Sequence, residues 1–411
     1  MQNNKITKSY VTIFFISALG ILLVNVHPWL GQNLVADEIY HQRQIEMFQA
    51  GTFDQQPELT TLPGYHWVVF SLTNFLNPNG LIALRIAGSL IGLAAVFLFD
   101  LAYRCLHGAS NGNRTLQVLF LPILFPFYFL LYTDAFSITI YLLMILFWLR
   151  GNHLLAAIAG AAAFYVRQPI IVFVFLIVLI DWLSFAIDQD KFNLTKVGEW
   201  LRYGWAYIVL AAGVGIFYIV NGGFAVGDAD AHPGGFVGWH NVTFSAWMAC
   251  IILWPISIGR VRQAITSMWT DRPVRLLVFV GACVFLILSV ITFEPSHPYN
   301  ALPGTLHNAI ILMATETTWG KLLLGIPILL IGVGMSQINL SKKSHYAIYL
   351  VWVASLIPFW LVEPRYSIPA FITWLLFVPP LDKPTEDRLL INSIFLSLIL
   401  FAGILLGVMF P

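Results

Sequence analysis

The chain has 411 residues, of which 59% are apolar and only 10% are charged, with a formal net charge of +1 at pH 7. Soluble domains carry about 25% charged residues, so the composition excludes a soluble domain and predicts an all-α, polytopic membrane protein. The near-zero net charge argues against a nucleic-acid partner and leaves membrane lipids as the surroundings.

Apolar runs long enough to cross a bilayer recur along the whole chain. A spanning helix needs about 20 apolar residues. The first run, which follows Lys5 and Lys8, has no A-x-A-like cleavage site after it and is predicted to stay as a helix. No repeat or soluble segment interrupts the series, so residues 1–411 are expected to form one transmembrane domain. The predicted spans, of which the shorter are expected to be re-entrant or broken, are 9–27, 82–106, 115–131, 134–150, 153–166, 170–184, 203–220, 242–259, 275–293, 319–336, 345–362, 366–380 and 390–410.

The basic residues predict the orientation. With the N-terminus inside, sixteen of the 21 lysines and arginines fall on the inner side, as the positive-inside rule requires. The outer side then receives five: Arg43, Arg85, Arg167, Lys321 and Arg365. It also receives the polar motifs, whereas the inner loops are plain basic anchors. This asymmetry predicts a reaction at the outer or luminal leaflet.

The first outer loop, residues 28–81, carries two adjacent acids, Asp37 and Glu38, where a helix leaving the bilayer ends. Ionisable groups at a membrane edge are costly and are functional candidates. Neighbouring residues on a helix point about 100° apart, so only one acid can face a reacting centre as a general base. The alternative is a solvated cap on the amphipathic stretch 38–50. The sequence does not decide which acid is the base.

Other outer motifs supply candidate ligand contacts. His41 follows the acids, and His66 follows a Pro-Gly turn in TTLPGYH, which is otherwise an ordinary loop. Asp134 of Tyr132-Thr133-Asp134 is either a second acid near the site or the cap of a helix. Arg167-Gln168-Pro169 places a guanidinium between two apolar runs, where it binds an anion such as phosphate or forms an internal ion pair.

Three later outer segments complete the candidate set. Asp228, Asp230 and His232 have the residue types of a metal site, but a sugar-binding or plain solvated loop explains them equally well. His297 begins a further polar cluster that includes Asn300, His307 and Asn308. Glu363 and Arg365 either pair with each other or leave Arg365 free for a phosphate.

In this order the motifs resemble the asparagine-linked-glycosylation alpha-1,2-glucosyltransferases. DEIYH at 37–41 and TTLPG at 60–64 are the most specific matches, with AGTF at 50–53 between them. The other matches are YTD at 132–134, Gly227-Asp228 with His232, and Glu363, Arg365, Tyr366 and Pro369. Two motifs depart from the family pattern. Pro169 follows Arg167-Gln168 where the family has another continuation, and only His297-Pro298 of a longer conserved segment is present.

The resemblance implies a GT-C glycosyltransferase-like helical bundle of about 12–13 transmembrane helices, with the catalytic acid in the first luminal loop. It also implies glucose transfer from dolichyl (polyprenyl) phosphate glucose to a lipid-linked oligosaccharide in N-glycan precursor assembly. A beta-linked donor and an alpha-1,2 product imply inversion by one displacement. Asp37 or Glu38 is then the base, Arg167 or Arg365 stabilises the departing phosphate, and no cofactor or metal is expected.

Three alternatives stay open. A mannosyl or aminoarabinose transferase of the same architecture fits the residue chemistry equally well. A lipid-linked sugar transporter would place ionisable residues near the bilayer midplane and show an inverted repeat, neither of which the sequence suggests. The membrane is that of the endoplasmic reticulum in a eukaryote, or the plasma (inner) membrane in a prokaryote.

Overall fold

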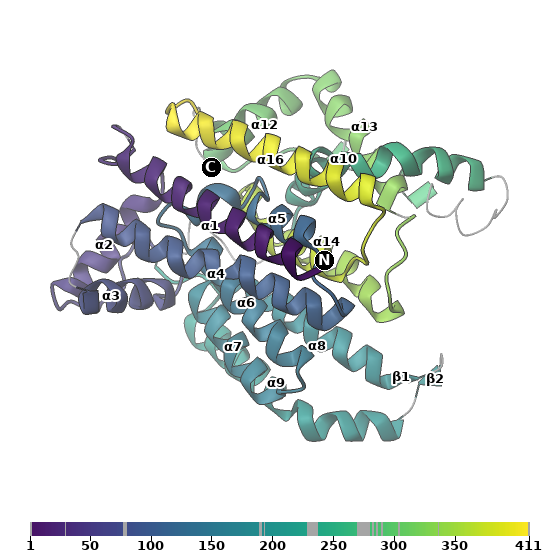
Figure 1. Cartoon of the computed structure of the whole chain (residues 1–411), viewed down its shortest axis with the longest axis horizontal. Helices are drawn as coiled ribbons and strands as arrows, with labels where there is room; N and C mark the ends of the chain where they lie inside the picture. Colours follow the sequence, from purple (N-terminus) through teal and green to yellow (C-terminus); the bar gives the residue numbers. More distant parts are fainter. Residues whose placement is uncertain are drawn as a thin grey trace.

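The computed structural model describes residues 2–28, 30–76, 80–188, 191–192, 194–227, 237–268, 280–281, 283–284, 287–288, 291–302, 305–335 and 337–409. These residues are mainly helical. Figure 1 shows a bundle in which α2 and α3 lie together at one end, and the short β1–β2 pair lies at the other. The strands, Ile187–Asp188 and Lys191–Phe192, are two residues long and antiparallel.

The elements follow one another along the chain with short connections. The 3₁₀ turns are η1 (Phe125–Tyr128), η2 (Gln168–Ile170), η4 (Pro298–Ala301), η5 (Lys343–Tyr346) and η6 (Pro364–Ser367). The helices are α1 (Gln2–Val26), α2 (Glu38–Gln49), α3 (Gly64–Leu76), α4 (Leu81–His107), α5 (Gly112–Leu119), α6 (Thr133–Leu149), α7 (His153–Val166), α8 (Ile171–Ala186), α9 (Leu194–Asn221), α10 (His240–Met268), α12 (Leu306–Glu316), α13 (Thr318–Met335), α14 (Ala347–Leu356), α15 (Ile368–Phe377) and α16 (Lys383–Leu405).

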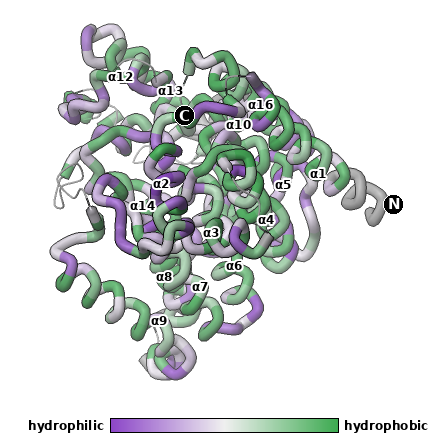
Figure 2. Tube along the Cα trace, turned by 90° about the vertical axis from the view of Figure 1, so that its left-hand side faces the viewer, coloured by the Kyte–Doolittle hydropathy of each residue, from purple (hydrophilic) through white to green (hydrophobic). Residues whose placement is uncertain are grey.

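The apolar helices match the size of a bilayer. Four stretches are both long and apolar enough to cross it: Leu81–His107, Gln168–Ala186, Thr195–Asn221 and Lys383–Leu405. Four shorter apolar helices accompany them among the described residues. In Figure 2, α4 and α6 are coloured mainly as hydrophobic, whereas α2 is largely hydrophilic. The prediction of an all-α, polytopic membrane protein is therefore confirmed.

The predicted span at 115–131 is wrong as a continuous helix. The chain instead forms α5, a turn and then η1. Pro122 and Pro126 explain the break, because proline lacks the N–H of the helical hydrogen bond and its ring clashes with the preceding turn. The segment from Val118 to Tyr132 is buried throughout. This apolar run is thus a piece of the bundle core rather than a membrane-facing helix.

Other predicted helix boundaries also differ from those in the structure. The predicted spans 345–362 and 366–380 contain shorter helices, α14 and α15, each preceded by a 3₁₀ turn. The last helix, α16, begins at Lys383 rather than at 390 because Asp382 caps it: the carboxylate accepts the Thr385 N–H. Helix α12 was not predicted. Most of the predicted span 275–293 lies outside the described residues.

Helix α4 connects the two ends of the bundle and packs closely on α6. A Cβ at Gly92 of α4 would lie 2.8 Å from the Cβ of Ala135 of α6, so only glycine allows this approach. Arg85 lies near the start of α4, and Asp100 and Arg104 lie near its end. A rise of about 1.5 Å per residue separates these two groups by roughly 20–30 Å. The candidate residues of the outer motifs are found at the Arg85 end.

Candidate active site

The adjacent acids Asp37 and Glu38 have very different surroundings. The amphipathic stretch predicted at 38–50 forms α2, and Asp37 occupies its N-cap position without making a side-chain cap hydrogen bond. The Asp37 side chain is 41% exposed. The Glu38 side chain, one residue later, is completely buried. As the helical geometry predicts, the two carboxylates point into different surroundings, one toward solvent and one into the core.

The Glu38 carboxylate is saturated with hydrogen bonds. Arg85 donates to it from Nε at 2.9 Å and from Nη2 at 2.5 Å. The backbone N–H groups of Val35 and Leu131 donate to its two oxygens at 2.8 and 2.7 Å. Arg85 is also completely buried. A buried carboxylate with four donors has no accessible lone pair for an incoming proton, so this geometry suits a structural role.

The Asp37 carboxylate faces a second arginine from the far end of the chain. Its Oδ2 lies 3.0 Å from Nη1 of Arg365 in η6. Glu363 binds the same guanidinium, with 2.9 Å between its Oε2 and the arginine Nε. Burial lowers the pKa of Arg365, but Glu363 and Asp37 outweigh it and raise the pKa well above its usual value. Arg365 therefore stays a cation held between two carboxylates.

Asp134 and Arg167 form a second ion pair beside the first. Arg167 donates from Nη1 to Oδ2 of Asp134 at 2.8 Å and to the Thr133 hydroxyl at 3.1 Å. Asp134 lies in the first turn of α6, whose N-cap is Tyr132, so it is not itself the cap. The Arg167 side chain remains 12% exposed while that of Asp134 is 2% exposed. One edge of the guanidinium is thus available to a further anion.

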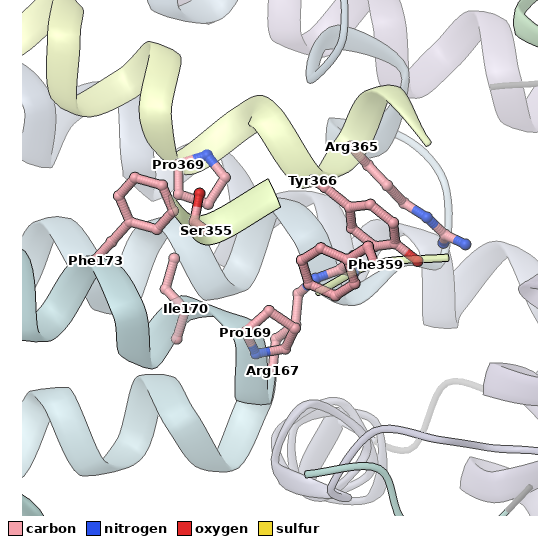
Figure 3. A pocket seen from close by; sticks show the side chains of 9 residues that line it. All are labelled: Arg167, Pro169, Ile170, Phe173, Ser355, Phe359, Arg365, Tyr366 and Pro369. Carbon is pink, nitrogen blue, oxygen red and sulfur yellow. The ribbon is translucent and has the colours of Figure 1, made fainter. Parts of the chain in front are cut away.

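Both arginines line one pocket between η2, α8, α14 and η6. Figure 3 shows Arg365, Tyr366, Phe359 and Arg167 toward one end of this pocket, and Phe173 and Ile170 toward the other. The Tyr366 ring stacks on Phe359 with 4.0 Å between the centroids. The pocket therefore combines two cationic groups with an apolar lining. The nine lining residues are Arg167, Pro169, Ile170, Phe173, Ser355, Phe359, Arg365, Tyr366 and Pro369.

The two predicted histidines of the first outer loop form a buried pair. Nδ1 of His41 lies 2.9 Å from Nε2 of His66, and the rings are stacked. Burial, followed by the charges of Arg365 and Arg167, lowers the pKa of His41 to about 3. Burial and His41 lower the pKa of His66 as well. The pair is neutral at physiological pH and acts through hydrogen bonds rather than charge.

Gln168 and the TTLPG turn hold the outer segments together. Gln168 donates from Nε2 to the carbonyls of Thr60 and Phe224, both at 3.1 Å. Gly64 allows the start of α3 to approach α7, because a Cβ there would lie 2.6 Å from the Tyr165 carbonyl oxygen. The packing of Gly64 against α7 thus supports the interpretation of TTLPG as a structural loop. Gln168 lies beside Arg167 and ties two loops to it.

The remaining predicted residues separate into two groups. His297 caps η4, accepts the Tyr299 N–H at 3.1 Å and packs against Trp360. It therefore sits beside the segment that leads to Glu363. Asp228, Asp230 and His232 lie outside the described residues. Within the part of the chain that the structure describes, no group of three His, Cys, Asp or Glu side chains is arranged to hold a metal ion.

Sequence reasoning missed two residues that build the site. Asn241 accepts the Glu363 N–H and donates to the carbonyls of Phe359 and Leu361, which fixes the loop before Arg365. Arg85 binds Glu38. A signal existed for Arg85, since a cation near the start of an apolar span needs a partner. Asn241 lies at the start of α10 and gave no comparable signal.

Comparison with known proteins gives a family. A model described as the DIE2/ALG10 family matches residues 32–376, which include the described site residues. A Drosophila melanogaster protein is 30% identical over 52% of this chain and 56% of its own length. An Arabidopsis thaliana protein is 21% identical over 97% of this chain and 95% of its own. Both are named Dol-P-Glc:Glc(2)Man(9)GlcNAc(2)-PP-Dol alpha-1,2-glucosyltransferase.

Two solved structures of one protein also matched this chain. The apo crystal structure of ArnT from Cupriavidus metallidurans has a TM-score of 0.42 and 16% sequence identity, covering 94% of this chain and 78% of that one. The same protein bound to undecaprenyl phosphate has a TM-score of 0.40.

Proposed function

Because the chain belongs to the DIE2/ALG10 family, we propose that it is an inverting alpha-1,2-glucosyltransferase of the GT-C type. Its donor is dolichyl (polyprenyl) phosphate glucose, and its acceptor is a lipid-linked oligosaccharide. The relatives' names state this activity for those proteins. The observation that carries the proposal is the pairing of an accessible carboxylate, Asp37, with Arg365, which lines an apolar pocket together with Arg167.

Asp37 is the base in this mechanism. Its carboxylate takes the proton from the acceptor hydroxyl while the hydroxyl oxygen attacks the anomeric carbon of glucose. The bond from that carbon to the phosphate oxygen breaks, and its electron pair leaves with the phosphate. Positive charge develops at the anomeric carbon, as in other glycosyl transfers. The burial of Glu38 and its four hydrogen-bond donors support Asp37 rather than Glu38 in this role.

Arg365 and Arg167 bind the donor phosphate and stabilise its growing charge. A guanidinium fork matches two phosphate oxygens, and its effect is larger in a site that excludes water. Arg365 already holds Asp37 through Nη1 alone. The same group therefore places the donor phosphate within reach of the base. Phosphate is a good leaving group, so the mechanism requires no general acid and no metal.

The other predicted site residues receive supporting roles in this proposal. We assign His41 to a neutral hydrogen bond with a sugar hydroxyl, oriented by His66. Glu363 holds Arg365, and Asp134 holds Arg167, at the distances given above. Gln168 and His297 support the loops around the site. Asp228 and His232 keep their predicted role toward the sugar as part of this proposal. The first outer loop, 28–81, then carries the base of a single domain, 1–411.

The location follows from the substrates. A dolichol-linked acceptor places the protein in the endoplasmic reticulum membrane of a eukaryote, with the site facing the lumen. A different polyprenyl carrier would place it in the plasma membrane of a prokaryote, with the site facing outward. The integral membrane character is common to both.

The test is sugar transfer by purified protein in detergent, from radiolabelled dolichyl phosphate glucose to a lipid-linked glycan. Asp37→Asn is expected to lower the rate by about 10²–10⁴-fold while still binding the donor and unfolding at the wild-type temperature. Glu38→Gln is expected to lower the unfolding temperature, because it leaves Arg85 as a buried, unpaired charge.

Three outcomes would contradict the proposal in whole or in part. Wild-type protein that binds the donor but transfers to no glycan acceptor would favour a transporter. Faster transfer from a mannosyl or aminoarabinosyl donor would replace glucose by that sugar and leave the rest of the mechanism standing. A chelator that abolishes transfer, with recovery on adding manganese, would overturn the metal-free mechanism.

A further inference from the structure

The backbone immediately before Asp37 has an unfavourable conformation. Ala36 has a φ of +47°, and it is the one non-glycine residue among those described that has a positive φ. An alanine side chain rarely adopts this left-handed region, so the surrounding contacts must hold it there. Such strain is typical of sites where a side chain has to be aimed. The residue that follows Ala36 is the proposed base.

We call the strained turn of the backbone at Ala36 the corner. The buried Arg85–Glu38 ion pair holds the chain on both sides of it. Arg85 donates from Nη1 to the Leu30 carbonyl at 2.5 Å and from Nη2 to the Asn33 carbonyl at 2.8 Å, which fixes the chain before Ala36. Glu38 fixes the chain after it and also accepts the Val35 N–H. Neither side chain is exposed. One ion pair therefore determines the path of the chain into and out of the corner.

The Tyr132 hydroxyl closes the corner from the other side. It accepts the Asp37 N–H at 3.0 Å and donates to the Val35 carbonyl at 3.1 Å. Burial and the nearby Asp37 raise the pKa of Tyr132 well above its usual value, so the hydroxyl keeps its proton. The Tyr132 ring also lies against the Arg365 guanidinium, with 6.0 Å from Cζ to the ring centre. Tyr132 thus contacts the backbone of the base and the side chain of its partner.

We propose that Tyr132 and Arg85 are positioning residues for glucosyl transfer, which together aim the Asp37 carboxylate by clamping the strained corner at Ala36. Arg85 acts through Glu38, and Tyr132 acts through the Asp37 backbone. This inference rests on the proposed function, because it requires Asp37 to be the base. It assigns a role to Glu38 that explains why two acids stand side by side although only one reaches the substrate.

Tyr132→Phe is the sharpest test, since it removes one oxygen and leaves the ring against Arg365. We expect kcat to fall by about 10–100-fold, as small displacements of a catalytic group cost up to this much. The Kd for dolichyl phosphate glucose is expected to stay within about twofold of wild type, because the phosphate contacts are unchanged. Measured together, kcat and Kd separate misplacement of the base from loss of donor binding.

Tyr141→Phe is the matched control. The Tyr141 hydroxyl is also fully buried and shares one hydrogen bond, 2.8 Å long, with Thr373, away from Asp37. Both variants lose one buried hydroxyl and should unfold at similar temperatures, but only Tyr132→Phe should lose kcat. In the Asp37→Asn background, Tyr132→Phe should change the residual rate by less than about twofold, because its effect passes through Asp37.

Substitutions at the buried pair, such as Glu38→Gln or Arg85→Lys, can prevent folding. Tyr132→Phe is therefore the variant that decides the inference. A wild-type kcat for Tyr132→Phe would overturn the inference while leaving the proposed function intact. Equal losses of kcat in Tyr132→Phe and Tyr141→Phe would overturn it too, since the effect would then be one of general stability. Glucose transfer at the wild-type rate by Asp37→Asn would instead refute Asp37 as the base, and wild-type protein that transfers no glucose would refute the proposed function itself.

Discussion

The two ends of the bundle both contain buried arginine–carboxylate pairs, but they differ in how completely the charges are satisfied. At the end away from α2, Arg114 of α5 binds Glu386 of α16, with 2.6 Å between Nη2 and Oε1. Gln117 and the Leu381 N–H donate to the same carboxylate. The side chains of the pair are 0% and 5% exposed. This pair resembles Glu38 with Arg85 and not Asp37 with Arg365.

The Asp37 end holds more negative than positive charge. Asp37, Glu363 and Asp134 surround Arg365 and Arg167, and Asp37 stays 41% exposed. A donor phosphate that binds these arginines must compete with carboxylates already there. An arginine–carboxylate pair is therefore expected to contact substrate directly only where its hydrogen bonds are incomplete and solvent reaches it. Saturated pairs far from Asp37, such as Arg114 with Glu386, are expected to affect stability alone, Arg85 with Glu38 also positions the base, and incomplete pairs are expected to take part in transfer directly.

The largest expected effect is on the free energy of unfolding, at the saturated pair of Arg114 with Glu386. Glu386→Gln leaves the Arg114 guanidinium buried without a counter-charge, which should lower the free energy of unfolding by about 3–5 kcal/mol. Transfer per folded molecule should stay at the wild-type value. Thermal unfolding in detergent, with activity normalised to folded protein, measures both. Lys383→Gln is the control, because its pair with Asp387 is exposed and worth about 0–1 kcal/mol. A loss of specific activity in Glu386→Gln would show that this saturated pair also affects transfer.

The second-largest expected effect is on the rate of transfer, at the pair of Asp37 with Arg365, whose hydrogen bonds are incomplete. Arg365→Lys keeps the positive charge but loses the fork that binds Asp37 and Glu363 and that we propose binds the donor phosphate. We expect transfer to fall by about 10²–10³-fold, the usual cost of removing one donor from a charge-stabilising site. The unfolding temperature should change little. Initial rates over a range of donor concentrations measure this. Arg104→Lys, at the other end of α4, should transfer normally, and equal losses in the two variants would refute the distinction.

A smaller effect is expected where a polar motif serves packing. Gly64→Ala would place a Cβ 2.6 Å from the Tyr165 carbonyl oxygen. Because backbone cannot move aside cheaply, we expect a loss of about 1–3 kcal/mol in unfolding free energy. Gly213→Ala in α9 meets nothing within 4 Å and should not destabilise the protein. Unfolding temperatures of the two variants decide the matter. Wild-type stability for Gly64→Ala would contradict the packing role of this glycine.

The local patterns of the sequence predicted much of this arrangement. The apolar runs located α4, α8, α9 and α10, because their length and composition alone make them helical in a bilayer. The polar motifs were predicted to lie on one side, and Asp37 and Arg365 do meet although they are far apart in the chain, but this pair was not itself predicted. The pairing of Glu363 with Arg365 was one of two predictions for that segment, and the other left Arg365 free for a phosphate.

What the sequence left open depended on tertiary contacts. The choice between Asp37 and Glu38 required knowing that Arg85 of α4 faces Glu38. The break at 115–131 follows from Pro122 and Pro126, but an apolar run of spanning length outweighed them in the prediction. Asn241 supports Arg365 only because α10 packs against the loop before η6. A helical period says which face a residue occupies, and not which distant side chain covers that face.

The smallest expected effect is a pH dependence at the histidine pair, and its sign follows from the lowered pKa of His41. The pKa falls from 6.5 in the unfolded chain to about 3 in the fold. The unfolded chain therefore binds more protons between these values, so stability is full above pH 6.5 and is lost as the pH falls below it, by up to about 1.4 kcal/mol per pH unit. His41→Asn should unfold with less acid sensitivity between pH 6.5 and 5. Unfolding temperatures of both proteins across this range measure the difference. Parallel curves would mean that His41 is charged or solvated in the fold, and the neutral hydrogen bond assigned to it would then be withdrawn.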